Sequence, residues 1–146
     1  MEYSTEITIN LPRERVLELF DSTENLYKWQ DGLESFEHIS GEPGQMGAKS
    51  KMVYNMNGRE VEMIETITSR NFPDEFSGTY EAKGVYNAVE NLFYEDGPAK
   101  TRWVANHLFK FSGMMKIMAV AMRGAFPKQT QESMEAFKTF AEARGS

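Results

Sequence analysis

The chain has 146 residues, a formal net charge of −6 and no cysteine. This length is enough to bury one sizeable core, so we expect residues 1–146 to form a single domain. The basic residues are dispersed among more numerous acidic ones, which argues against a nucleic-acid partner because phosphate binding needs a clustered basic surface. The lack of cysteine excludes disulfides, thiolate metal sites and cysteine nucleophiles, and it agrees with a cytoplasmic location.

No targeting or membrane-spanning segment is expected. The first ten residues have neither the basic region nor the apolar run of a signal peptide. The most apolar stretch, Met114 to Phe126, is too short to cross a bilayer and contains Lys116 and Arg123.

The N-terminal part of the chain predicts a strand, two short helices and a second strand. Glu2 to Leu11 alternates apolar and polar side chains, as a half-buried strand does. Pro12 suits the start of a helix, and the polar residues 21–23 separate it from a second short helix that reaches Trp29. Leu33 to Ser40 is expected to be the second strand.

Two tight turns predict the register of the next four strands. Asn57-Gly58 is the strongest hairpin signal in the chain, and Lys83-Gly84 fits a second two-residue turn. Directly opposed residues share a face of the sheet, which gives each hairpin one mainly apolar face. That register also places the carboxylate of Glu65 on the apolar side. The expected opposed pairs are Tyr54 with Val61, Met52 with Met63, Ser50 with Glu65, Tyr80 with Asn87 and Phe76 with Asn91.

The last strand, Thr101 to Phe111, has one face that is rich in aromatic residues. This face carries Trp103, Ala105, His107, Phe109 and Phe111. With a loop of Asp96 to Pro98, the expected opposed pairs are Asn91 with Trp103 and Asn87 with His107. A loop one residue longer would change this register. The pairing predicts a polar cluster on the concave side of the sheet, made of Tyr80, Asn87, Asn91 and His107.

The C-terminal stretch from Gly113 to Ala143 predicts a long helix that lies across the sheet. Its apolar residues recur every three or four positions, and they are Met114, Met115, Met118, Met122, Phe126, Met134, Phe137 and Ala141. We expect Met118, Met122 and Phe137 to be buried against the concave face. A kink or break is expected between Gly124 and Pro127, with Pro127 in the first turn of the second half.

This order of elements resembles the START-like, or helix-grip, superfamily (SRPBCC), which includes pollen-allergen-type ligand carriers and the polyketide cyclase/dehydrase group. The segment INLPRERVLELFDSTENLYKWQDGL is similar to the opening of many bacterial members, and ETITSRNFPDEF resembles their turn between two strands. Thr101-Arg102, after Gly97, resembles the start of their last strand. The resemblance implies an α+β fold in which a curved seven-stranded antiparallel sheet, with two short helices after its first strand, grips the C-terminal helix around a cavity.

A ligand site is expected in that cavity, because the inward face mixes apolar groups with a few convergent polar ones. Small side chains such as Ser50, Gly78 and Ala82 leave room there. The candidate ligand-binding residues are Trp29, Met52, Tyr54, Met63, Glu65, Phe76, Tyr80, Asn87, Asn91, Trp103, His107, Met115, Met118 and Met122. The plain alternative is that the aromatic and methionine residues form core and that the polar ones satisfy each other.

Three functions remain open from the sequence. The first is binding of a small hydrophobic molecule, such as a lipid, a polyketide or an aromatic compound. The second is a cyclase- or dehydratase-like enzyme that moves protons through His107, Glu65 or Tyr80. The third is a homodimeric interaction protein that pairs through Val104 and Leu108 on the outer face. No metal or cofactor motif is visible, so we expect neither group.

Overall fold

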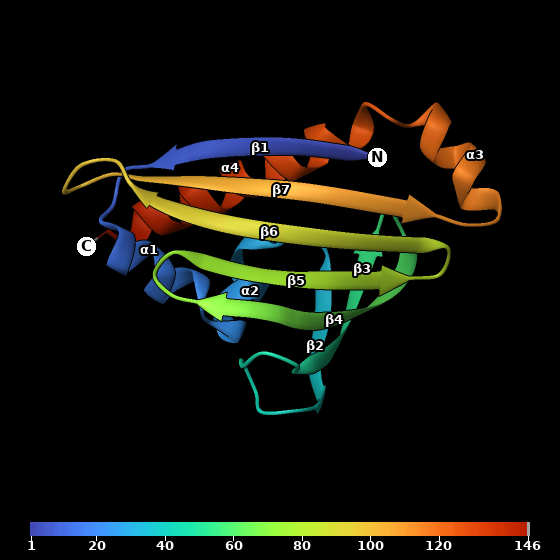
Figure 1. Cartoon of the computed structure of the whole chain (residues 1–146), viewed down its shortest axis with the longest axis horizontal. Coiled ribbons are helices and arrows are strands. Elements are labelled where there is room, and N and C mark those ends of the chain that lie inside the picture. The colour runs from blue at the N-terminus through green and yellow to red at the C-terminus, as the bar shows by residue number, and fades with distance from the viewer. Residues whose placement is uncertain (146) are drawn as a thin grey trace.

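The computed structural model describes residues 1–145 and has the expected α+β architecture (Figure 1). Seven antiparallel strands form one curved sheet in the order β1-β7-β6-β5-β4-β3-β2. The strands are β1 (Glu2–Ile9), β2 (Leu33–Ser40), β3 (Lys49–Met56), β4 (Arg59–Asn71), β5 (Glu75–Ala82), β6 (Val85–Glu95) and β7 (Thr101–Phe111). The helices are α1 (Arg13–Phe20), α2 (Thr23–Trp29), α3 (Met114–Ala121) and α4 (Ala125–Arg144).

The two short helices follow β1, as the capping signals predict. Pro12 directly precedes α1, where its missing N–H costs nothing. Ser22 caps α2, and its side chain accepts a hydrogen bond from the backbone N–H of Asn25 at 3.2 Å. Trp29 is the last residue of α2, so the helix end fixes where this indole enters the core.

The register predicted from the two tight turns is confirmed. Tyr54 lies opposite Val61, Met52 opposite Met63, Tyr80 opposite Asn87 and Phe76 opposite Asn91. At the first turn Asn57 and Gly58 have φ values of 56° and 82°. A tight hairpin turn of this kind needs such left-handed backbone at both central residues, which is why this dipeptide is informative.

The predicted register between β6 and β7 is wrong. Glu95 pairs with Thr101, so the loop runs from Asp96 to Lys100 rather than to Pro98. It is closed by a hydrogen bond from the Asp96 N–H to the Lys100 carbonyl at 3.0 Å. Asn91 therefore lies opposite Ala105, and Asn87 lies opposite Phe109. Because the slip is an even number of residues, every side chain stays on its predicted face.

The C-terminal stretch forms two helices, not one kinked helix. α3 ends at Ala121 and α4 begins at Ala125, so the break lies at residues 122–124, just before the predicted position. Pro127 is in the first turn of α4, as expected. Its missing N–H is tolerated there because first-turn N–H groups have no partner within the helix.

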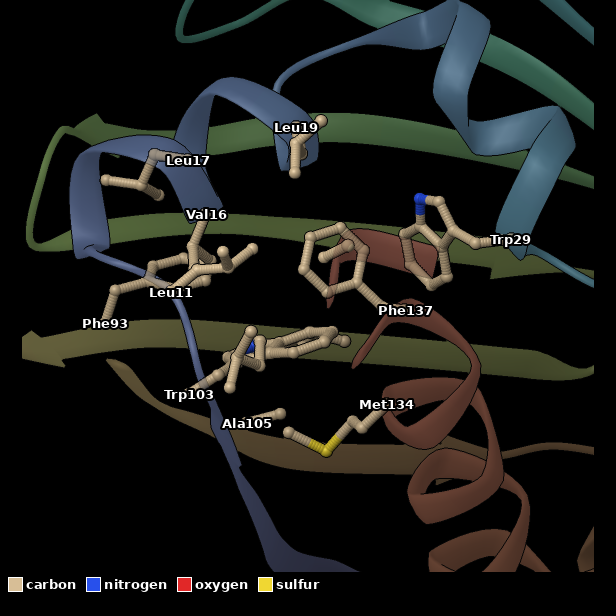
Figure 2. Close-up of a cluster of buried hydrophobic side chains, with 13 residues drawn as sticks. Leu11, Val16, Leu17, Leu19, Trp29, Phe93, Trp103, Ala105, Met134 and Phe137 are labelled. Carbon is tan, nitrogen blue, oxygen red and sulfur yellow. The ribbon is translucent and has the colours of Figure 1, made fainter. Parts of the chain in front are cut away.

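The core lies between α4, the two short helices and the sheet. Phe137 and Ala141 of α4 are fully buried, and Figure 2 shows Phe137 between Trp29 and Trp103. The predicted burial of Met118 and Met122 is wrong, because these side chains are 41% and 49% exposed. α3 lies beyond the end of β7 rather than across the sheet (Figure 1), so the sheet does not cover Met118.

Candidate functional site

A row of polar side chains crosses the concave face of the sheet. Ser50, Glu65, Tyr80 and Asn87 are consecutive partners on β3, β4, β5 and β6. The adjacent row on the same face contains Met52 and Met63. The two turn signals set the pairs Ser50–Glu65 and Tyr80–Asn87, and the pairing of β4 with β5 joins these pairs into one row.

Glu65 and Tyr80 form the best-defined pair in the row. The Tyr80 hydroxyl donates a hydrogen bond to Oε2 of Glu65 at 2.8 Å, and the Glu65 side chain is 8% exposed. Burial raises the pKa of Glu65, and the hydrogen bond from Tyr80 opposes that shift. No basic side chain within residues 1–145 forms an ion pair with this carboxyl group.

Two tyrosines near Glu65 stay protonated at neutral pH. Burial, and then the charge of Glu65, raises the pKa of Tyr80 well above its ordinary value. The same two causes, in the same order, raise the pKa of Tyr54. The Tyr54 hydroxyl donates to the side-chain oxygen of Gln30 at the end of α2. Both phenols therefore act as hydrogen-bond donors at this site.

Gly78 packs closely against β4 beside the Tyr80 hydroxyl. A Cβ atom at Gly78 would lie 3.8 Å from the Tyr80 hydroxyl and 3.0 Å from the Thr66 carbonyl oxygen. The second distance is tighter than ordinary van der Waals contact. A side chain at this position would therefore crowd the backbone of β4.

His107 belongs to a separate polar pair. Nδ2 of Asn87 lies 3.3 Å from Nδ1 of His107 and donates to it, so the imidazole proton is on Nε2. Burial lowers the pKa of His107 to about 4, which makes the ring neutral at pH 7. The ring stacks on Tyr3 at 4.9 Å between centroids and on Phe109 at 5.9 Å. Nε2 has no hydrogen-bond partner within residues 1–145.

The two indoles of the core differ in their hydrogen bonding. Nε1 of Trp103 donates to Oδ1 of Asn91 at 2.9 Å. Trp29 is only 8% exposed, yet its Nε1 is the one buried side-chain nitrogen or oxygen in the described chain without a partner. Figure 2 shows this nitrogen on the edge of the ring that faces away from Trp103. A buried N–H group without an acceptor is costly.

No protein-family model and no curated protein matches this chain. Solved structures do match. An aromatase/cyclase, Zhui from Streptomyces sp. R1128, superimposes with a TM-score of 0.80 at 14% identity over 99% of this chain and 94% of its own. A START superfamily protein from Mycobacterium smegmatis gives 0.76 at 9% identity over 97% of both chains. Ara h 8.0201 gives 0.70 at 15% identity over 98% of both chains.

The chain has the START-like helix-grip fold. Identities this low establish the fold alone, because this fold supports many functions. The function of the helix-grip fold in this protein depends on its own side chains.

The helix-grip sheet brings together one part of the predicted site and buries another in the core. Trp29, Met52, Asn91 and Trp103 are all less than one-tenth exposed and pack in the interior. Phe76 packs edge-on against Phe20 at 5.9 Å between ring centroids. The remaining sheet residues, half-buried on the concave face, are Tyr54, Met63, Tyr80, Asn87 and His107. Met118 of α3 and Met122, which follows this helix, are not among them, since both are exposed.

Several side chains at the site were not among the predicted ones. Tyr3 lies opposite His107 in the register of β1 and β7 and stacks on its ring. The alternation of β1 placed Tyr3 inward, but nothing in the sequence paired β1 with β7. Gln30 contacts Tyr54 because α2 ends beside β3, which is a tertiary relation without a local signal. No group of three or more His, Asp or Glu side chains within residues 1–145 is placed to hold a metal ion.

Proposed function

We propose that residues 1–146 form one domain that binds a small hydrophobic molecule on the concave face of the sheet. The row through Glu65 and Tyr80 carries the proposal. It places a few polar groups in a half-buried apolar surface, which is the composition of small-molecule sites. Tyr54, Met63, Asn87 and His107 line the same face and complete the proposed site.

The donors at this site indicate the class of ligand. Nε1 of Trp29 and Nε2 of His107 both have protons without a partner in the described chain. The carboxylate of Glu65 already accepts from Tyr80. A ligand with carbonyl or ether oxygens would satisfy these donors, whereas a pure hydrocarbon would leave them unpaired. The proposed ligand is therefore an oxygen-bearing aromatic or polyketide-like compound.

Native mass spectrometry of the purified protein tests binding directly. We expect a defined hydrophobic compound to co-purify unchanged. Acetylnaphthalene and isopropylnaphthalene have nearly the same shape, and only the first has an acceptor oxygen. The proposed site should prefer acetylnaphthalene by about threefold to tenfold, the range of one hydrogen bond. Equal affinity for both compounds, or none for either, would contradict the proposed ligand class.

A matched pair of substitutions separates the indole N–H from the ring. Trp29→Phe should remove most of the preference for acetylnaphthalene, because the proton without a protein partner is lost. Trp103→Phe is the control, since that proton is already bonded to Asn91. The control should lower stability by about 1–3 kcal/mol and retain the preference. Loss of the preference in both variants would mean that the ring, not the N–H group, determines ligand choice.

A cyclase- or dehydratase-like enzyme is the second candidate. The aromatase/cyclase among the structural neighbours and the buried carboxyl group of Glu65 support it. A raised pKa would suit Glu65 to proton transfer, whereas Nδ1 of His107 is occupied by Asn87. An enzyme would release a converted product, and Glu65→Gln would abolish conversion while ligand affinity changed little. Recovery of the ligand unchanged, from wild type and Glu65→Gln alike, favours the binding protein.

A further inference from the structure

Helix α3 carries its apolar side chains on the outside. Met114, Ile117 and Val120 are 76%, 73% and 70% exposed, and they recur at helical spacing on one side. Ala119, on the opposite side, is the only buried residue of this helix. Helices in water normally direct such a face into the core, and a contiguous exposed apolar surface marks an interaction site.

The chain around α3 is basic although the protein as a whole is acidic. The segment 98–131 contains no Asp or Glu, while the net charge of the chain is −6. Its basic residues are Lys100, Arg102, Lys110, Lys116, Arg123 and Lys128. The apolar helix therefore lies within the one long stretch of the sequence that has positive charge alone.

Three of these basic residues surround one depression beside α3. Lys110, Lys116 and Arg123 line an open hollow of about 700 Å³ between α3, the end of β7 and the start of β1. None of the three forms an ion pair within residues 1–145. Glu2 is the only acidic residue in the lining, so the hollow has an excess of positive charge.

We propose that α3 docks on the surface of an anionic phospholipid bilayer. Ile117 and Val120 enter the boundary between headgroups and acyl chains, while Lys116 and Arg123 contact headgroup phosphates. Interfacial helices combine an exposed apolar surface with nearby basic side chains in this way. No helix within residues 1–145 has the length and apolar character needed to cross a bilayer, so α3 lies on the surface. A second copy packed on α3 in a two-fold arrangement matches this surface less well, because it would bring the same basic side chains, Lys116 and Arg123, against each other.

The position of α3 ties the docked surface to one end of the sheet. The side chain of Met115 rests on the turn between β5 and β6, where a Cβ atom at Gly84 would lie 2.8 Å from its Cγ. Docking through α3 would therefore bring this end of the concave face to the membrane. The inference does not depend on the proposed ligand, because docking is measured with the protein alone.

Co-sedimentation with vesicles tests the proposal. Vesicles of equal parts phosphatidylcholine and phosphatidylglycerol should bind the protein, and phosphatidylcholine vesicles should bind it at least tenfold more weakly. Raising the salt concentration should weaken binding to the anionic vesicles, because it screens the charges. Lys116→Gln with Arg123→Gln should weaken it by tenfold or more, since each charge contributes about fivefold. Lys28→Gln with Arg59→Gln removes equal charge elsewhere and should change binding little.

A second matched pair tests the apolar contribution. Ile117→Gln should reduce binding about tenfold, because the side chain no longer enters the apolar boundary. Ile39→Gln, at a residue of β2 that is 52% exposed, should have little effect. Equal binding to both kinds of vesicle, or equal losses in both members of either pair, would overturn the proposal. It would also be overturned by a dimer in solution, seen by analytical ultracentrifugation, that Ile117→Gln dissociates, since a second copy would then cover α3.

Discussion

Helices α3 and α4 come from one stretch of sequence and lie in very different surroundings. Both have apolar residues at helical spacing, yet Phe137 of α4 is fully buried and Ile117 of α3 is 73% exposed. α4 packs along β1 and against α2, whereas α3 lies beyond the end of β7 and does not cover the sheet. A helical apolar pattern therefore shows that a helix has a face to cover, and the topology decides what covers it.

Substitution of Phe137 should have the largest effect on stability. Its ring contacts Trp29 at 5.1 Å and Trp103 at 5.5 Å between centroids, with no exposed surface. Phe137→Ala would leave a cavity among rigid aromatic rings, and we expect a loss of about 3–5 kcal/mol in the free energy of unfolding. Urea denaturation measures this loss. A loss below about 1 kcal/mol would show that α4 is not the centre of the core.

The sequence could predict α4 and the hairpins because their signals are local. Asn57-Gly58 determines a turn, and the turn determines the register of β3 and β4. The loop between β6 and β7 has no such signal, and its length was wrong by an even number of residues. The concave face was predicted correctly because the faces of a strand depend on parity alone.

The candidate site could be predicted only in part, because only some of its contacts have a local signal in the sequence. The hairpin registers predicted Glu65 opposite Ser50 and Tyr80 opposite Asn87. The pairing of β4 with β5, which joins Glu65 to Tyr80 by a hydrogen bond, had no turn signal in the sequence. Tyr3 and Gln30 reach the site through the pairing of β1 with β7 and the end of α2, and no sequence pattern encodes those contacts. The exposure of Met118 was unpredictable because periodicity does not locate the end of the sheet.

Acid should destabilise the aromatic stack that joins β1 and β7 to the start of α4. His107 stacks on Tyr3 and Phe109, and Phe109 in turn contacts Phe126 at the start of α4 at 5.1 Å. Because burial lowers the pKa of His107 to about 4, the unfolded chain binds the proton first. The stabilisation is complete above pH about 6.5 and is lost as the pH falls toward about 4.

The expected loss from this one histidine is about 2–3 kcal/mol. Thermal and urea unfolding of wild type and His107→Gln across this pH range would measure it, and the variant should show a flatter dependence. His38→Gln serves as the control, because His38 is exposed on β2 and should leave the profile unchanged. Parallel profiles for wild type and His107→Gln would place the titration elsewhere.

Loss of the Tyr80 hydroxyl should have a smaller effect. Tyr80→Phe removes the donor to Glu65 and leaves a buried carboxyl group without that bond, at a cost of about 1–2 kcal/mol. Burial has already raised the pKa of Glu65, and removing the donor raises it further. The destabilisation should therefore grow as the pH rises and carboxylate forms. Tyr94→Phe, at a residue that is 42% exposed, is the control and should cost almost nothing at any pH.

Substitution of Ile117 should have the smallest effect on folding. Its side chain contributes little to the core, because it is 73% exposed on the outer side of α3. Ile117→Gln should change the free energy of unfolding by less than about 0.5 kcal/mol, the usual range for surface positions. Urea denaturation beside Phe137→Ala gives the direct comparison of the two helices. A loss above about 2 kcal/mol would mean that Ile117 is buried in the folded protein in solution, and that α3 and α4 share one core after all.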